Sequence, residues 1–285
     1  ELLSGVVDYV AVSYSGAYLK SDGTVYGLGN TSVPNSLTDI AKLVGSSSSI
    51  AALTHSGDVI SWGTIPTQAP ITLVKDVFAS SYSFAALKTD GTLEFWGDSD
   101  KGGANNNSDL AEALNAGVTV VGVVPAKGSF AVLGSDDVVY GVGAEVFTLD
   151  VAGPAVVKIV AAGSGVENAF AILRDDGSVE LVGPGNVGSP SGAVLDAIDG
   201  DVRVTQLVGN EAGFYALRED GTVIAWGGYG VPDFNLVPMA EGVVELSGGR
   251  LLMGAIHDDG AVSVHGWGAA GSMLTPASPV VIAAT

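Results

Sequence analysis

The chain has 285 residues and no cysteine, so neither a disulfide framework nor thiolate chemistry is available to it. Its 31 acidic residues outnumber the 11 basic ones, which leaves a formal net charge of −20. Nucleic-acid binding depends on Lys and Arg side chains that neutralise phosphates, so this charge argues against nucleic acid and anionic membranes as partners. The apolar runs, such as residues 117–126, are too short to span a bilayer, and no membrane insertion is predicted.

One short pattern recurs seven times: two apolar runs flank a turn that is usually Asp-Gly. In chain order the copies are YLKSDGTVYGLG (18–29), ALTHSGDVISWG (52–63), ALKTDGTLEFWG (86–97), VLGSDDVVYGVG (132–143), ILRDDGSVELVG (172–183), ALREDGTVIAWG (216–227) and AIHDDGAVSVHG (255–266). The turn positions are 34, 34, 46, 40, 44 and 39 residues apart. Tight hairpin turns need positive φ, which glycine adopts without steric cost, so each copy predicts a β-hairpin.

A further β-rich run precedes each hairpin, and each unit spans about 40 residues. Three clear strands and a less regular fourth match one blade of a β-propeller. The sequence therefore predicts an all-β, seven-bladed propeller that forms one domain over residues 1–285. We expect the C-terminal run PVVIAAT (279–285) to close the ring by pairing in the same blade as VVDYVAVS (6–13). A solenoid of stacked repeats is the alternative, but no cap-like ends are visible. Residues 109–117 are the one stretch that could form two helical turns.

The repeats resemble those of the regulator of chromosome condensation (RCC1) family, and SFAALKTDGTLEFWGDSDKGG (83–103) is the copy most similar to its pattern. The resemblance covers all seven units and implies a seven-bladed propeller. The family's histidine is replaced at Ser15, Ser49, Ser83, Ser129, Ala169, Gly213 and Leu252, and its tryptophan is kept at Trp62, Trp96 and Trp226. The family includes a nucleotide exchange factor, a β-lactamase inhibitor and many interaction modules, so the fold implies no single function. The acidic charge contradicts chromatin binding by analogy.

Residue types typical of catalysis are sparse. His55, His257 and His265 lack metal-ligand spacing, and no Gly-x-Ser-x-Gly elbow occurs. The sequence predicts no catalytic residue, no metal site and no cofactor. One loop, 98–109, places Asp98, Asp100 and Asp109 at calcium-ligand spacing, but it lacks other ligands of an EF-hand, and a structural turn is the alternative interpretation. The repeated Phe84, Phe130, Phe170 and Phe214 and the tryptophans are expected in the core between blades.

The two ends of the predicted blades differ in character. The Asp-Gly turns lie at one end, where turn propensity explains the acidic residues, although their charge could also attract a cation or a basic partner. The other end carries unequal loops, and rigid scaffolds usually place function in such loops. Interfaces favour Tyr and Arg, so we expect binding at Tyr14, Tyr82, Lys127 and Arg250, with the 97–117 insert at the rim. The alternative is that the sides of the propeller make the contacts within an assembly.

These features predict a non-enzymatic binding or assembly module whose partner is another protein or a surface glycan. The charge suits an extracellular setting, a cell surface or a virus particle, where the module would belong to a larger assembly. The alternatives are an enzyme inhibitor of the kind found in the resembled family, and a propeller lyase or glycosidase, which would need titratable groups that converge at the axis.

Overall fold

The computed structural model describes residues 4–13, 15–29, 32–34, 37–65, 71–149, 153–163, 168–184, 190–227, 241–266 and 273–274. Within these ranges seven antiparallel sheets follow one another in sequence order, which confirms the all-β class and the sevenfold repeat. The chain divides into two compact units, residues 1–151 and 152–285, which are described one at a time. The prediction of a single domain stays a prediction.

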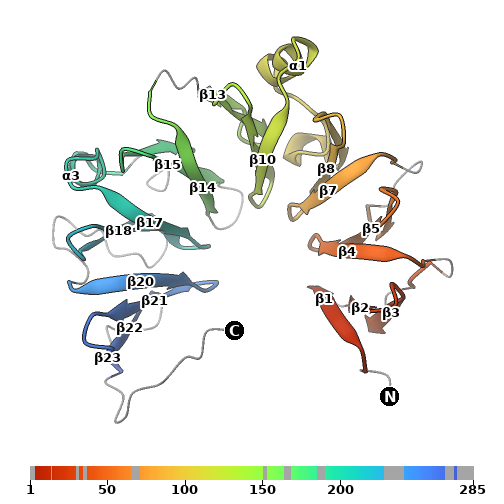
Figure 1. The fold of residues 1–285 in the computed structure, drawn as a ribbon, viewed down its shortest axis with the longest axis horizontal. Coiled ribbons are helices and arrows are strands. Elements are labelled where there is room, and N and C mark those ends of the chain that lie inside the picture. Colours follow the sequence, from red (N-terminus) through yellow and green to blue (C-terminus); the bar gives the residue numbers. More distant parts are fainter. Residues whose placement is uncertain are drawn as a thin grey trace. The chain divides into compact units, whose positions relative to one another are not determined.

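The first unit contains four sheets, whose strands are labelled in Figure 1. Its first two sheets are formed by β1 (Val6–Val12), β2 (Ser15–Lys20) and β3 (Val25–Gly29), and by β4 (Ile40–Gly45), β5 (Ser49–Thr54) and β6 (Val59–Gly63). The next two are formed by β7 (Val74–Ala79), β8 (Ser83–Lys88) and β9 (Leu93–Gly97), and by β10 (Val120–Pro125), β11 (Ser129–Gly134), β12 (Val139–Gly143) and β13 (Phe147–Leu149). Between β9 and β10 lie the 3-10 helix η1 (Ser99–Lys101) and the helix α1 (Ser108–Asn115), which confirms the two helical turns expected there.

The second unit contains three sheets of the same pattern. They are formed by β14 (Val156–Ala162), β15 (Ala169–Arg174) and β16 (Val179–Val182), by β17 (Val204–Gly209), β18 (Gly213–Arg218) and β19 (Val223–Gly227), and by β20 (Val243–Gly248), β21 (Leu252–His257), β22 (Val262–Gly266) and β23 (Met273–Leu274). Helix α3 (Gly192–Ala197) precedes β17. We call the seven sheets blades 1 to 7 in chain order. Among the described residues a fourth strand, as the sequence predicts for every blade, is present in blades 4 and 7.

Each blade begins with two successive hairpins, and its first strand carries an irregularity at the same place. The strand register shifts between Val6 and Asp8 in blade 1, and the corresponding shift recurs in every other first strand. A β-bulge bends and twists the strand that carries it. The repeat therefore includes a built-in twist of the first strand, which the apolar pattern alone does not reveal.

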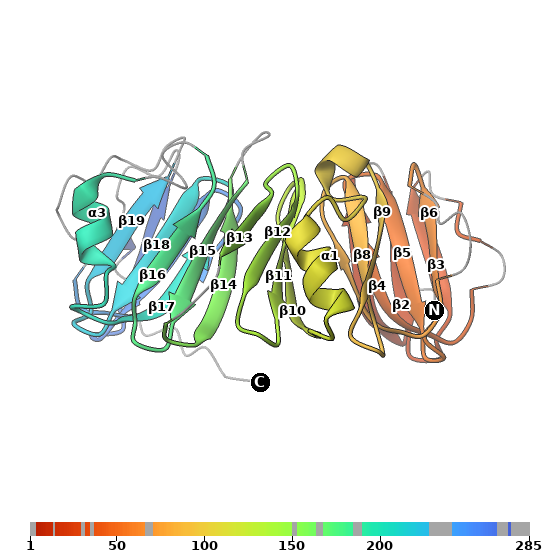
Figure 2. The same ribbon diagram turned by 90° about the horizontal axis from the view of Figure 1, so that it is seen from above.

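Consecutive blades within each unit pack face to face through apolar side chains. Between blades 1 and 2, for example, Ala17 and Leu19 share a cluster with Ile50, Ala52 and Trp62. The repeated phenylalanines Phe84, Phe130, Phe170 and Phe214 are all fully buried, which confirms their expected place in the core. Figure 2 shows α1 beside the strands of blades 3 and 4, where its Leu110 is buried in their shared cluster.

The Asp-Gly turns use their carboxylates locally. Asp22 accepts hydrogen bonds from the Thr24 hydroxyl and backbone N–H, at 2.6 and 3.0 Å, and Asp90 accepts the same pair from Thr92. The bond from the threonine hydroxyl has the largest effect and that from the backbone N–H the next largest. Together they hold the pKa of each carboxyl below its ordinary value. The acidic residues at this end of the blades are thus turn residues, as propensity predicts.

Asp137 occupies the turn position that is glycine in the other six units, and its φ of 60° is in the left-handed region. We expect Asp137→Gly to raise the free energy of unfolding by about 0.5–1 kcal/mol, because a residue with a Cβ is strained at this φ. Urea unfolding measures the change. The neighbouring Asp136→Gly is the control and should destabilise, because Asp136 accepts hydrogen bonds from Val138 N–H and the Tyr140 hydroxyl. A destabilising Asp137→Gly would contradict the strain argument.

Two further expectations concern the chain's ends and membranes. The C-terminal run 279–285, expected to close the ring, lies outside the described residues. Within the described part of the chain no helix is long and apolar enough to cross a membrane.

Candidate functional site

The end of each blade opposite the Asp-Gly turn is where the first strand passes into the second, and we call this end the loop side. In the first unit the loop tips are joined in series by backbone hydrogen bonds. Ser13 N–H donates to the Ser47 carbonyl, Ser47 N–H to that of Ser81, and Ser81 N–H to that of Lys127, at 3.0–3.1 Å. In the second unit Gly163 is joined to Asn210, and Glu211 to Arg250, in the same way. The loop tips are therefore held by main-chain bonds independent of their side chains.

Small polar side chains hold each loop in shape. Ser80 Oγ accepts hydrogen bonds from the N–H groups of Tyr82 and Ser83, and Asn210 Oδ1 does the same for Ala212 and Gly213. The buried serines at the position of the family's histidine bond to the chain that leaves the third strand. Ser83 Oγ, for example, donates to the Lys101 carbonyl at 2.6 Å. These serines thus organise the connection that follows the third strand.

The structure places three of the four predicted binding residues. Tyr82 and Lys127 are half-buried on neighbouring loop tips of the first unit, and the Ser81–Lys127 backbone bond joins those tips. Arg250 lies in the second unit with 80% of its side chain exposed, and its Nε donates to Glu211 Oε1 at 2.9 Å. Tyr14 lies outside the described residues. Tyr82 and Lys127 are therefore brought together, and Arg250 is paired with an acidic neighbour.

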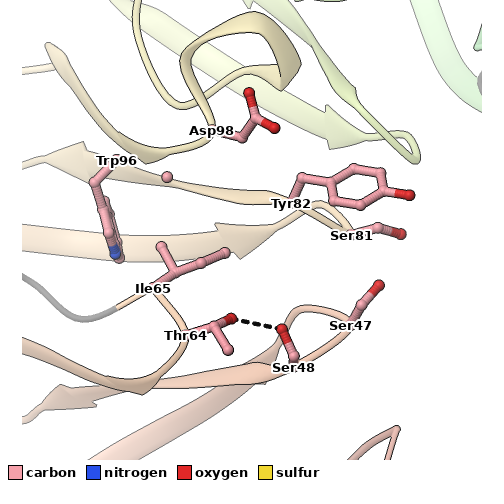
Figure 3. Close-up of a pocket in the computed structure, with 9 residues that line it drawn as sticks. Ser47, Ser48, Thr64, Ile65, Ser81, Tyr82, Trp96 and Asp98 are labelled. Atoms are coloured by element: carbon pink, nitrogen blue, oxygen red, sulfur yellow. Dashed lines mark hydrogen bonds between the residues drawn. The ribbon is translucent and has the colours of Figure 1, made fainter.

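A pocket of about 500 Å³ opens on the loop side between blades 2 and 3. It is lined by Ser47, Ser48, Thr64, Ile65, Ser81, Tyr82, Trp96, Gly97 and Asp98. Figure 3 shows Trp96 at one end, Tyr82 and Ser81 at the other, and Ile65 between them. The Ser48 and Thr64 hydroxyls lie 2.6 Å apart along one wall. The pocket thus combines two aromatic rings with several hydroxyl groups, and its size is typical of sites for small ligands.

Trp96 is fixed in place from within the protein. Its ring stacks on that of the buried Phe84 with 5.1 Å between the centroids, and its Nε1–H donates to Ser61 Oγ at 3.1 Å. The sequence predicts a core position for this residue, as for the other tryptophans. Trp62 and Trp226 are buried, and Trp96 packs against the core between blades 2 and 3 as expected, while its half-buried ring also lines the pocket. Its hydrogen bond to blade 2 holds it at the opening between the sheets.

Lys101 neutralises the acidic side of the pocket. Its Nζ lies 4.1 Å from the centre of the Tyr82 ring and 3.7 Å from Asp98 Oδ2. Gly97 allows this arrangement, because its φ is 124° and a Cβ there would lie 2.6 Å from the Tyr82 carbonyl oxygen. The glycine of the Trp-Gly motif therefore allows the connection after β9 to lie close to the Tyr82 loop.

The 98–109 loop uses its polar side chains to hold itself in place. Asp98 caps η1 by accepting from Asp100 N–H, and Asp109 accepts from the Thr148 hydroxyl at 2.6 Å. The buried Asn107 caps α1 and donates to the Gly141 and Phe147 carbonyls. Among the described residues no three His, Cys, Asp or Glu side chains are grouped as a metal would require. These contacts support the structural interpretation of the loop.

Two histidines of blade 7 meet at one serine, which the sequence analysis did not foresee. The Nε2 atoms of His257 and His265 lie 2.9 and 3.0 Å from Ser263 Oγ, and His257 Nδ1 lies 3.0 Å from the Glu241 carbonyl. Burial, and then the neighbouring His257, lower the pKa of His265. Ser263 is only 2% exposed, so its hydroxyl serves the packing of the blade rather than an open site.

No protein-family model and no curated protein matches this chain. Among solved structures it is similar to the CRINKLY WD40 ectodomain of the Arabidopsis thaliana receptor kinase ACR4, with 16% identity, a TM-score of 0.47 and 92% of each chain covered. It is also similar to Prp20p, the RCC1 of Saccharomyces cerevisiae, with 13% identity, a TM-score of 0.44, and 92% of this chain and 72% of that one covered. The C-terminal domain of gp131 from bacteriophage phiKZ is similar over 95% of this chain and 84% of that one, with 10% identity and a TM-score of 0.45.

All three TM-scores are below 0.5, so the case for the fold is the sheet topology itself. The seven antiparallel sheets of the described residues, each built around the repeated hairpin, have the form of β-propeller blades.

Proposed function

We propose that this protein is a non-enzymatic recognition module that binds another protein or a surface glycan through its loop side. The observation that carries the proposal is the series of backbone hydrogen bonds that joins the loop tips beside an open, aromatic-lined pocket. Loops held in this way lose little conformational entropy when a partner binds, so more of the contact energy appears as affinity. The Asp carboxylates at the other end are occupied in turns, which leaves the loop side as the better binding surface.

Three finer features belong to the same proposal. The blades close into one propeller by pairing of the run 279–285 with blade 1. The module works outside the cell, on a cell surface or on a virus particle, within a larger assembly, a setting that the net charge of −20 supports by keeping the surface soluble. The chain acts without catalytic residues. Among the described residues Ser263 is the one hydroxyl that bonds to two histidines, and its burial supports a non-enzymatic role.

The test compares the two ends of the blades in one capture experiment. The tagged chain is incubated with extract and surface fractions from its source, and bound material is quantified by mass spectrometry. Tyr82→Ala and Lys127→Ala are expected to reduce the captured partner at least tenfold, because truncating a central Tyr contact costs about 1.4 kcal/mol or more.

The matched controls are Asp22→Asn and Asp90→Asn on the turn side, which should leave capture unchanged while circular dichroism shows every variant folded. Loss of capture in the Asp variants alone would contradict the assignment to the loop side and would favour a basic partner at the turns.

A further inference from the structure

The pocket between blades 2 and 3 has a composition that selects among ligand classes. Its lining residues Ser47, Ser48, Ser81 and Thr64 carry hydroxyl groups, each of which can donate and accept a hydrogen bond. Trp96, Tyr82 and Ile65 add apolar surface at the same place. A ligand that fits must have an apolar face and, around its edge, groups that both donate and accept.

The charges around the pocket restrict the charge that a ligand can carry. The Asp98 carboxylate faces the opening, and the whole chain carries a charge of −20, so an anionic ligand would be repelled. A cationic ligand would have to displace Lys101, whose ammonium group already lies over the Tyr82 ring and beside Asp98. The ion pair between Lys101 and Asp98 satisfies both charges, so the groups of the pocket that remain free to bind a ligand are uncharged.

We propose that this pocket binds a neutral pyranose unit of a glycan. The apolar C–H face of the sugar ring would pack on Trp96, whose ring is held by Phe84, and the sugar hydroxyls would bond with Ser48 and Thr64. The inference rests on the proposed function and names the ligand class for the same surface. It requires no movement of the loops, because Ser47 and Ser81 are joined by a 3.1 Å backbone hydrogen bond.

The pocket is also built on fixed elements rather than on a single loop. Trp96 stands on β9, where Ser61 of β6 anchors its nitrogen at 3.1 Å, and Asp98 N–H donates to the Tyr82 carbonyl at 3.1 Å. Sites that are fixed before binding lose less entropy on association, which matters for sugars because each of their hydrogen bonds replaces one to water.

The test is a glycan array that carries neutral mono- and oligosaccharides, with sialylated and sulfated glycans and Arg-containing peptides as comparisons. The folded chain is expected to bind a subset of the neutral glycans, and titration of a bound sugar should change tryptophan fluorescence saturably. Ser48→Ala combined with Thr64→Val removes exposed hydroxyls without opening the core and is expected to weaken binding at least fivefold. The matched control is Thr148→Val, which removes a surface hydroxyl outside this pocket.

Each result decides between the claims. An array without neutral-glycan signal, or sugar binding that is unchanged by Ser48→Ala/Thr64→Val and by Tyr82→Ala, overturns the glycan assignment. Binding to Arg peptides alone also overturns it and shows that Lys101 can be displaced. If no sugar binds while Tyr82→Ala still abolishes capture of a protein, the proposed function stands and the glycan inference fails. If substitutions on the loop side weaken neither sugar binding nor capture of a protein, the glycan inference and the proposed function both fail.

Discussion

Replacing Glu180 with alanine is expected to lower the free energy of unfolding by about 3 kcal/mol, because the change leaves a buried guanidinium without its charged partner. Arg174 has 1% of its side chain exposed, and its Nη2 donates to Glu180 Oε2 at 2.8 Å. Its other described side-chain contact is a longer bond from Nη1 to the Pro154 carbonyl, at 3.3 Å, and its buried Nε has no partner. Glu180 is therefore the main compensation for this buried charge.

Blade 3 contains a matched control for this experiment. Lys88 and Glu94 occupy the same repeat positions as Arg174 and Glu180, and their charged atoms are also 2.8 Å apart. However, Lys88 has 29% of its side chain exposed, so water can replace its partner. We expect Glu94→Ala to cost about 1 kcal/mol or less, because solvent-accessible ion pairs contribute little.

The two variants are compared by urea unfolding followed by circular dichroism, with Glu180→Gln as a variant that keeps a hydrogen-bond acceptor. The expected order of stability loss is Glu180→Ala, then Glu180→Gln, then Glu94→Ala. Equal losses for Glu180→Ala and Glu94→Ala would show that burial of Arg174 does not govern the energy of the pair.

The sequence predicts most of the blade architecture because the turns and strands of the repeat follow from local residue preferences. Positive φ at the turn restricts its residue to glycine or a tolerated aspartate, and Asp137 adopts that conformation as expected. The burial of the phenylalanines follows from their recurrence at one strand position in four of the seven copies. The fourth strands do not follow from the sequence so readily, since β13 (Phe147–Leu149) is a three-residue strand with little pattern of its own.

The pocket is harder to predict because it depends on how two blades meet. Trp96 has the same repeat position as the buried Trp62, and no local pattern distinguishes them. The difference arises from contacts that are remote in the sequence, such as Ser61 at the Trp96 nitrogen and Lys101 at the Tyr82 ring. Tyr82 could be chosen from the sequence because it lies in a loop, whereas Trp96 could not.

Blade 1 has the exposed third strand that ring closure would require. In β3 the side chains of Tyr26 and Leu28 are 42% and 50% exposed, whereas every residue of β12, which is covered by the fourth strand β13, is buried. An exposed apolar edge strand is a liability that proteins cover or pair. We therefore propose that the run 279–285 forms the fourth strand of blade 1 and pairs with β3.

Deleting residues 276–285 is expected to destabilise the protein by about 3 kcal/mol or more, because a strand formed by this run would bury at least two apolar side chains, each worth about 1.5–3 kcal/mol. Thermal unfolding of the deletion variant, and of a variant in which these ten residues become a Gly-Ser segment, measures the loss; both should unfold at clearly lower temperature. Because the chain has no cysteine, a cysteine at Tyr26 combined with one at position 280, 281 or 282 reports the pairing directly, through a disulfide that alters mobility on a non-reducing gel. An unchanged melting temperature together with no disulfide at any of the three positions would refute closure by this segment. A lower melting temperature without a disulfide would show that the segment stabilises the fold from a position other than the edge of β3.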